Sequence, residues 1–181
     1  MSDFAKFSDK QLVALVQITK DHNAFTELVI RHQATLCAFL YRFSGNQFQA
    51  EDLTQETFIK SYNNISKFNQ ESTFKTWLFS IGYREFLQSK RKSNTIINMI
   101  ERFKQSSNHK NSTNIEENID LENALKNLNN QQKAAILLCD ACGMSHTEAS
   151  QTMDVPLGSL KTYVKQARKI MQNILGENHG R

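Results

Sequence analysis

The sequence predicts an all-α protein with two small helical domains joined by a flexible linker. Helix breakers are scarce, with one proline and six glycines in 181 residues, and apolar residues recur at intervals of three and four. A polar stretch rich in Asn and Ser, residues 106–118, interrupts this pattern. Such a stretch buries too little apolar surface to offset the entropy lost on ordering, which is typical of a linker.

The composition limits the class of protein. A hydrophobic content of 39% and a charged content of 22% are typical of a soluble globular chain. The net charge of +4 favours an acidic partner such as nucleic acid. The N-terminus does not resemble a signal peptide, and no apolar run is long enough to span a bilayer. We therefore expect a cytoplasmic protein without direct membrane insertion, and its odd count of three cysteines favours reduced thiols.

Four helices are predicted before the linker. Their apolar residues follow helical spacing, as in the stripe Phe74, Trp77, Leu78 and Ile81 of the fourth helix. Gly45 marks the end of the second helix, and the polar segment from Ser66 to Thr73 is predicted to be a loop. The four helices are expected at residues 9–20, 24–44, 48–65 and 74–92.

A second helical unit begins near Ile119. Ser145 and Glu148 form a capping box, in which each side chain bonds the backbone amide of the other residue, so a helix should begin at Ser145. Asp154 to Pro156 then turns the chain, with proline in the first turn of the next helix. The predicted helices after the first are residues 131–143, 145–153 and 157–175.

The last helix has one apolar stripe and otherwise basic and polar side chains. No Asp or Glu occurs between Asp154 and Glu177, whereas solvated helix faces usually mix both signs. A capped helix, a tight turn and a second helix with a basic face are typical of a DNA-reading helix-turn-helix. An ordinary solvated face is the alternative. The exposed faces are expected to carry Ser159, Lys161, Thr162, Tyr163, Lys165, Gln166, Arg168 and Lys169.

Two segments, read together, resemble a known family. The first runs from residue 50 to residue 78 and contains Ala50-Glu51-Asp52-Leu53, Gln55-Glu56, Phe58, Lys67-Phe68 and Phe74-Lys75-Thr76-Trp77-Leu78. The second contains "LENALKNLNNQQKAAILL" and "GMSHTEASQTMDVPLGSLKTYVKQAR". They are similar to regions 2 and 4 of bacterial RNA polymerase sigma factors of the sigma-70 family, in the extracytoplasmic-function (ECF) group. The resemblance covers about residues 22–92 and 119–175 and implies a region 2 domain at 1–94, a linker at 95–117 and a region 4 helix-turn-helix domain at 118–181.

The resemblance implies a sigma factor that directs RNA polymerase to promoters and promotes melting of the −10 element. Its implied partners are core RNA polymerase, promoter DNA (duplex at −35, melted at −10) and an anti-sigma factor. Carried over residue by residue, the core-binding positions are Asp52, Gln55 and Glu56. The −10 positions are Phe68, Asn69, Ser72, Lys75, Trp77, Arg84, Gln88 and Arg91. The −35 positions are Ser159, Lys161, Thr162, Lys165, Gln166, Arg168 and Lys169.

Some of these positions have a second interpretation. The spacing of Trp77 also suits burial in the core. The cations at residues 90–92 also suit compensation of a helix dipole. The chain departs from the family at Gln70, where the loop usually has a glycine, and this departure bears on the shape of the base pocket.

The stretch "CDACGMSH" holds Cys139 and Cys142 at C-x-x-C spacing, followed by His146. A metal site, a redox pair and a structural helix end are the three interpretations. No second C-x-x-C completes a zinc set, so we predict no metal, with Cys139 partly in the core and Cys142 near the surface.

The sequence predicts neither an enzyme nor a cofactor, because no catalytic triad, phosphate loop or paired-carboxylate pocket is recognisable. The alternative function is a helix-turn-helix transcriptional regulator that acts without core polymerase.

Overall fold

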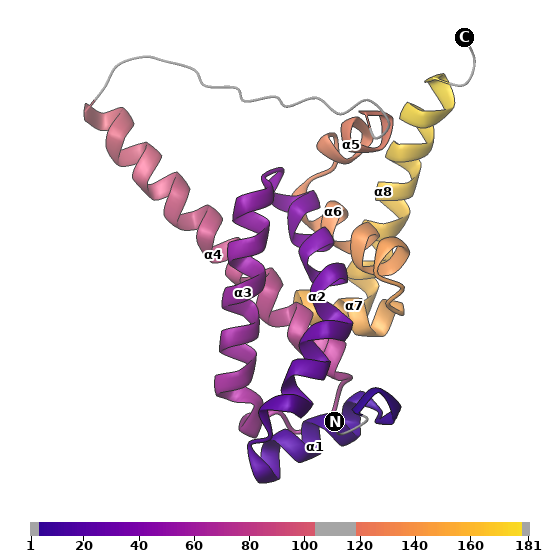
Figure 1. Cartoon of the computed structure of the whole chain (residues 1–181). Helices are drawn as coiled ribbons and strands as arrows, with labels where there is room; N and C mark the ends of the chain where they lie inside the picture. The colour runs from indigo at the N-terminus through magenta and orange to yellow at the C-terminus, as the bar shows by residue number, and fades with distance from the viewer. Residues whose placement is uncertain (1–3, 104–118, 179–181) are drawn as a thin grey trace.

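The computed structural model describes residues 4–103 and 119–178, in which all regular structure is helical (Figure 1). The first unit contains the 3-10 turn η1 (Phe4–Lys6), α1 (Asp9–Thr19), α2 (His22–Ser44), α3 (Gln47–Asn64), the 3-10 turn η2 (Ile65–Lys67) and α4 (Phe74–Phe103). The second contains α5 (Ile119–Lys126), α6 (Asn130–Ile136), the π-helical turn η3 (Leu137–Ala141), α7 (His146–Met153) and α8 (Leu157–Asn178). The predicted all-α fold with two units is confirmed.

Helix α4 is longer than the sequence suggested. Residues 95–103, which we assigned to the linker, continue the helix to Phe103. The chain has neither glycine nor proline between Gly82 and Gly143. No helix-breaking residue therefore ends α4 where the sequence becomes more polar. The end of α4 projects away from the rest of the molecule (Figure 1), and residues 104–117 of the expected linker lie outside the described residues.

Helices α2, α3 and α4 form the core of the first unit, with Leu28, Leu36 and Phe79 fully buried. Gly82 lies where α4 packs closely on α2 and α3. A Cβ atom at this position would lie 3.1 Å from Leu36 Cδ1 and 3.3 Å from Thr57 Oγ1. The missing side chain therefore permits the close packing of α4 on its neighbours.

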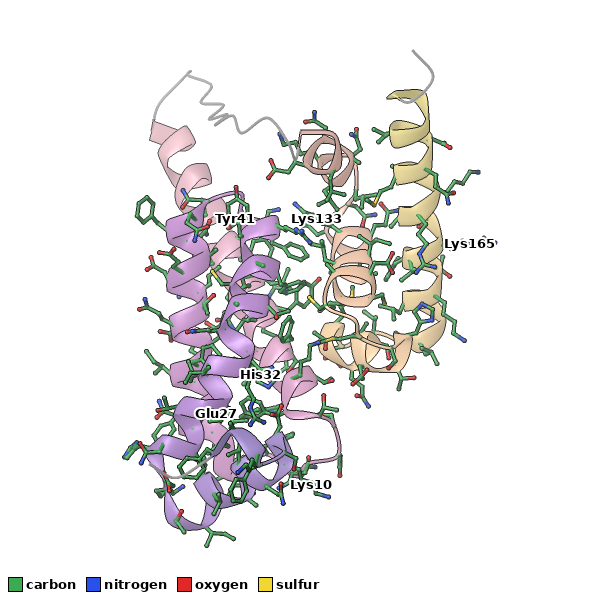
Figure 2. All side chains as sticks on the ribbon, turned by 45° about the vertical axis from the view of Figure 1, so that its right-hand side comes forward. Lys10, Glu27, His32, Tyr41, Lys133 and Lys165 are labelled. Carbon is green, nitrogen blue, oxygen red and sulfur yellow. The ribbon has the colours of Figure 1, made fainter. Side chains whose placement is uncertain are left out.

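A charged network holds the N-terminal segment on α2. Asp9 accepts from His32 Nε2 at 2.6 Å and from Arg31 Nη1 at 3.0 Å. Arg31 also bonds Glu27 at 2.8 Å and donates to the carbonyl groups of residues 4, 5 and 7. Figure 2 shows Glu27 and His32 on α2 beside α1. The hydrogen bond from His32 and the charge of Arg31 lower the pKa of Asp9.

In the second unit, Leu138, Leu160 and Ala167 are buried between α6, α7 and α8. The predicted capping box is present: Ser145 N donates to Glu148 Oε2 at 2.9 Å, and Glu148 N donates to Ser145 Oγ at 3.2 Å. Gly143 ends the preceding turn with φ at +66°. These features place α7 and α8 as the two helices of a helix-turn-helix.

The two units pack against each other and share a continuous apolar cluster. Helix α4 lies against α7, and Lys75 Nζ donates to the carbonyl of Cys142. Thr152 Oγ1 lies 3.5 Å from the Thr76 carbonyl oxygen. Lys133 Nζ lies 5.6 Å from the Phe43 ring centroid, and burial lowers its pKa. The sequence predicted two separate domains and did not reveal this contact.

Asp9→Asn should lower the free energy of unfolding by about 1 kcal/mol at pH 7, because a charge-assisted network loses its carboxylate at a partly exposed site. The folded-state pKa of Asp9 lies below its ordinary value of 3.8, so this stabilisation is present above that pH and is lost as the pH falls through the folded value. Urea denaturation at pH 7 and pH 3 tests this. Glu122→Gln, at an exposed acid, should change neither measurement.

Candidate core-polymerase and nucleic-acid interfaces

The predicted core-binding residues lie on one exposed face of α3. Asp52, Gln55 and Glu56 are all exposed. Glu56 pairs with Lys60 at 3.4 Å, and Lys60 pairs with Glu85 of α4 at 2.5 Å. This face therefore carries acidic groups and one cation, Lys60, which pairs with Glu85 of α4.

Two large apolar side chains, Phe48 and Ile59, are exposed beside this acidic face. Their exposure was not predicted from the sequence. Phe48 is 79% exposed and Ile59 is 55% exposed. They lie four residues before Asp52 and four residues after Gln55, so the four side chains follow one helical stripe. The available signal was this spacing, but it cannot separate an exposed apolar residue from a buried one.

The loop from Ser66 to Thr73 joins α3 to α4, and Ser66 and Lys67 belong to η2. Asn69 is exposed and Ser72 is half-buried, whereas Phe68 is only 5% exposed. The Phe68 ring stacks on Trp77, with centroids 4.8 Å apart and an angle of 20° between the planes. The loop residue Phe68 therefore packs against the half-buried Trp77 of α4 and is turned away from solvent.

Gln17 of α1 holds this loop in position through hydrogen bonds. This role was not predicted from the sequence. Its Nε2 donates to the carbonyl oxygen atoms of Ile65 at 2.7 Å and Phe68 at 2.8 Å. Its Oε1 accepts from Gln70 Nε2 at 3.4 Å. These partners are 48 and more positions away in the chain, so no local pattern reveals them.

Gln70 adopts the left-handed conformation, with φ at +59°. This conformation costs a residue other than glycine about 1–2 kcal/mol. The loop thus requires here the backbone geometry that glycine supplies most easily, which accounts for the usual glycine at this position of the related loop.

A cavity of about 590 Å³ lies beside the loop. Loop residues Gln70 and Ser72 line one side, and Asp9 of α1 lines another. Glu148 and Gln151 of α7 form part of the wall, so both units line this cavity. Bonds from the Ser145 backbone N–H and hydroxyl lower the pKa of Glu148, and so does the positive charge of Lys75.

The predicted −10 residues further along α4 line its exposed surface. Arg84, Gln88 and Arg91 are exposed. Lys90 lies 3.2 Å from Asn130 Oδ1 and 5.8 Å from the Phe86 ring centroid, so this cation also contributes to the contact between the units. Lys75, in contrast, is half-buried at the start of α4.

The predicted −35 residues lie on the outer surface of α8. Ser159 is half-buried, whereas the others are exposed: Lys161, Thr162, Lys165, Gln166, Arg168 and Lys169. Figure 2 shows Lys165 on the side of α8 away from the first unit. The opposite side, with Leu160, Val164 and Ala167, is buried. The helix therefore presents a basic surface of the kind that attracts DNA phosphates.

Two of these residues have partners within the second unit. Arg168 Nη2 donates to Asp140 at 2.7 Å. Gln166 Oε1 accepts from Gln132 at 3.1 Å. Arg168 is thus partly neutralised, and its pKa is raised by the hydrogen bond to Asp140. Lys161, Lys165 and Lys169 supply the basic character of the surface.

The cysteines do not form a metal or redox centre among the described residues. Cys142 is 6% exposed, which corrects the prediction that it lies near the surface. It is buried in the apolar cluster that the two units share, and its carbonyl oxygen accepts from Lys75 Nζ of α4. Burial raises the pKa of the Cys142 thiol to about 11, and it also raises that of Cys139. Such thiols are poor nucleophiles at neutral pH. No group of three or more His, Cys, Asp or Glu residues is arranged to hold a metal in the described part of the chain.

Among residues 4–103 and 119–178, no helix is both long and apolar enough to cross a membrane.

Two family models match the chain: sigma-70 region 2 over residues 28–96, and sigma-70 region 4 over residues 119–171. The ECF RNA polymerase sigma factor SigE of Mycolicibacterium smegmatis is 32% identical, over 98% of this chain and 73% of the relative. The ECF RNA polymerase sigma-E factor of Haemophilus influenzae is 31% identical, over 93% and 95%. The solved sigma factor RpoE from Bartonella quintana, in complex with the anti-sigma factor NepR, has a TM-score of 0.72 and 29% identity, over 84% and 96%.

A helical bundle followed by a helix-turn-helix with an exposed basic surface defines a DNA-binding transcription factor. The two matched regions and the full-length relatives narrow this class. The chain belongs to the sigma-70 family, in its ECF group. It therefore acts in promoter-specific initiation of transcription by RNA polymerase.

Gln17→Ala should loosen the loop, because two backbone carbonyl groups lose their donor at a cost of about 1–3 kcal/mol. The expected result is faster hydrogen exchange of the amides at residues 65–72, with α2 unaffected. Gln47→Ala, at an exposed position of α3, is the matched control. Equal exchange in both variants would show that other contacts hold the loop.

Proposed function

We propose a division of work between the two units of this sigma factor. The first unit binds core polymerase through α3 and captures the melted −10 element with the loop from Ser66 to Thr73. The second unit reads the duplex −35 element with α8. The observation that carries the proposal is the separation of opposite charges: an exposed acidic face lies on α3, and an exposed basic face lies on α8.

The α3 face suits a basic, partly apolar partner such as a coiled coil of the polymerase. Asp52 and Glu56 offer carboxylates that orient the encounter and raise its rate. Phe48 and Ile59 offer exposed apolar area at the edges of the same stripe, and burying such area stabilises a complex at roughly 25 cal/mol per Å². We therefore add these two residues to the predicted core-binding set of Asp52, Gln55 and Glu56.

The loop suits a single unstacked base. Its neighbouring cavity is of a size that accepts a small planar group, and Asn69 and Ser72 offer polar atoms for base edges. Trp77 and Phe68 form an aromatic pair under the loop, on which a base can stack if the loop shifts. Arg84, Gln88 and Arg91 lie further along α4 and suit the backbone of the same strand.

On α8, the exposed side chains of Lys161, Thr162, Lys165 and Gln166 suit contacts with base edges in the major groove, while Arg168 and Lys169 suit phosphates. Ser159, half-buried near the start of the helix, suits a contact to the backbone.

Membership of the family also bears on the regulation, the location and the chemistry of the protein. An anti-sigma factor regulates the protein, in line with the complex of the similar RpoE. The protein acts in the cytoplasm, where the polymerase is located. It has no catalytic site of its own and depends on the polymerase for chemistry, so it requires no cofactor.

Run-off transcription with core polymerase across a promoter library tests the proposal. Sequence-selective transcripts that require the added chain are expected. DNA binding without any gain in transcription would instead support a helix-turn-helix regulator that acts without core polymerase.

Asp52→Arg should weaken binding to core polymerase about tenfold, because a carboxylate facing a basic partner becomes a repulsive cation. Fluorescence anisotropy of the labelled protein, titrated with core, measures this. The control Glu122→Arg makes the same charge change on α5 and should bind like the parent. Equal binding of both variants would exclude the α3 face as the contact.

Lys165→Glu should weaken binding to duplex DNA that contains the selected −35 sequence. It should also make the negative slope of log K against log salt shallower by about one, because one cation that releases counterions is lost. Lys126→Glu, an exposed cation of α5, controls for net charge. A salt slope equal to that of the parent would place the reading surface elsewhere.

A further inference from the structure

Gln166, one of the side chains proposed to read bases from α8, is held by a side chain of another helix. Its Oε1 accepts from Gln132 Nε2 of α6 at 3.1 Å. Thr162, in contrast, donates to the Gly158 carbonyl within α8 itself. Gln166 is exposed and Gln132 is half-buried, and α6 packs along α8. The orientation of one proposed reading residue is therefore set from outside the reading helix.

The capping box at the start of α6 fixes which atom Gln132 turns toward α8. The backbone N–H of Asn129 donates to Gln132 Oε1 at 3.1 Å, and Gln132 N donates to Asn129 Oδ1 at 2.9 Å. Because a backbone N–H can only donate, the prong of the Gln132 amide that faces Asn129 must be the oxygen. The other prong, the Nε2 donor, is therefore the one that faces Gln166.

Gln166 must in turn present an acceptor to this donor. Its Oε1 is accordingly turned toward α6. The oxygen and the nitrogen of an amide lie on separate prongs of one planar group, so the Nε2 prong of Gln166 is left to face away from α6. The exposed side chain thus offers N–H donors to a ligand of α8.

Donors and acceptors divide the four bases into two groups in the major groove. Guanine and thymine carry an exocyclic oxygen, which accepts, whereas adenine and cytosine carry an exocyclic amino group, which donates. A glutamine that turns freely usually pairs with adenine through both of its prongs. A glutamine whose oxygen is held by another helix instead favours guanine or thymine.

We infer that Gln132 is a positioning residue for promoter specificity: it holds Gln166 with the nitrogen outward, so that the −35 base facing Gln166 is guanine or thymine. The inference rests on the proposed reading of the −35 element by α8, and it names part of the sequence that is read. It also extends the determinants of specificity to α6, which lies outside the helix-turn-helix formed by α7 and α8.

The experiment uses core polymerase with the full-length chain, on the promoter that the parent transcribes best from the library. Each −35 base pair is changed in turn to the other three, and the transcript yields give the base preference. Gln166→Ala identifies the base pair that Gln166 meets, as the position where the preference is lost. The parent should prefer one orientation of that pair by about fivefold, as for one good contact between a side chain and a base.

Gln132→Glu tests the inference while it preserves the fold of α6. Glutamate keeps the capping box, because its carboxylate still accepts from Asn129 N, but it has no N–H to donate and should accept from Gln166 Nε2. The Gln166 oxygen then faces outward, and an adenine or cytosine should replace the guanine or thymine on the same strand. The preference should therefore reverse, to about fivefold for the opposite orientation of the pair.

Gln131→Glu is the matched control, because it adds the same charge at the exposed neighbouring position of α6. It should keep the preference of the parent. The added negative charge lowers the yield with every base alike, so the ratio between bases is unaffected in either variant. In a Gln166→Ala background, Gln132→Glu should change nothing at this base pair.

Base analogues that lack the exocyclic oxygen or amino group, placed in one strand at a time, show which base of the pair is contacted. Removal of the oxygen should lower the yield of the parent about fivefold, and removal of the amino group from the paired base should not. The opposite result would overturn the inference.

An unchanged preference in Gln132→Glu, or a base preference that Gln166→Ala leaves intact at every −35 position, also overturns the inference. Circular dichroism checks the helix content of the variant; where it is lost, Gln132→Met decides. Methionine leaves the Asn129 side chain as a cap but cannot hold Gln166, so the preference should fall below about twofold, and a retained preference counts against the inference. Absence of transcripts from the whole library sinks the proposed function, whereas transcripts with an unchanged preference sink only the role of Gln132.

Discussion

The rest of the structure depends on the packing of the start of α4 between the core of the first unit and the second unit. Its apolar side, with Phe74, Leu78 and Phe79, completes the core of the first unit. Its opposite side lies on the second unit, where Lys75 contacts Cys142, just after η3, and Thr76 contacts Thr152 of α7. The loop that precedes α4 also owes its position to this helix, because Phe68 stacks on Trp77. One helix therefore joins the two units and shapes the candidate −10 site.

The distribution of charge fits a protein that binds two different macromolecules. Carboxylates gather on α3, and cations gather on α8 without any intervening acid. The small net charge of +4 does not reveal this separation, because the charges of the two faces largely cancel in the sum. Because surface charges act over about one Debye length, each face attracts its own partner with little interference from the other.

The C-x-x-C motif has a structural explanation. Cys139 and Cys142 flank the end of η3, and Gly143 reverses the chain before the capping box of α7. Cys142 is buried in the apolar cluster that the two units share, and its backbone carbonyl, not its thiol, accepts the hydrogen bond from Lys75. A small side chain suits this position because the two units approach each other closely.

The sequence by itself determined the features that depend on local spacing. Helical periodicity, the capping box at Ser145 and the absence of acids between Asp154 and Glu177 were sufficient for the all-α fold, the helix-turn-helix and the exposed basic surface of α8. Tertiary structure alone decided the contacts between distant segments: the bonds of Gln17 to the loop, the burial of Cys142 and the packing of α7 on the start of α4. These depend on how two apolar surfaces meet in space, and a one-dimensional pattern shows that a face is apolar without showing which other face will cover it.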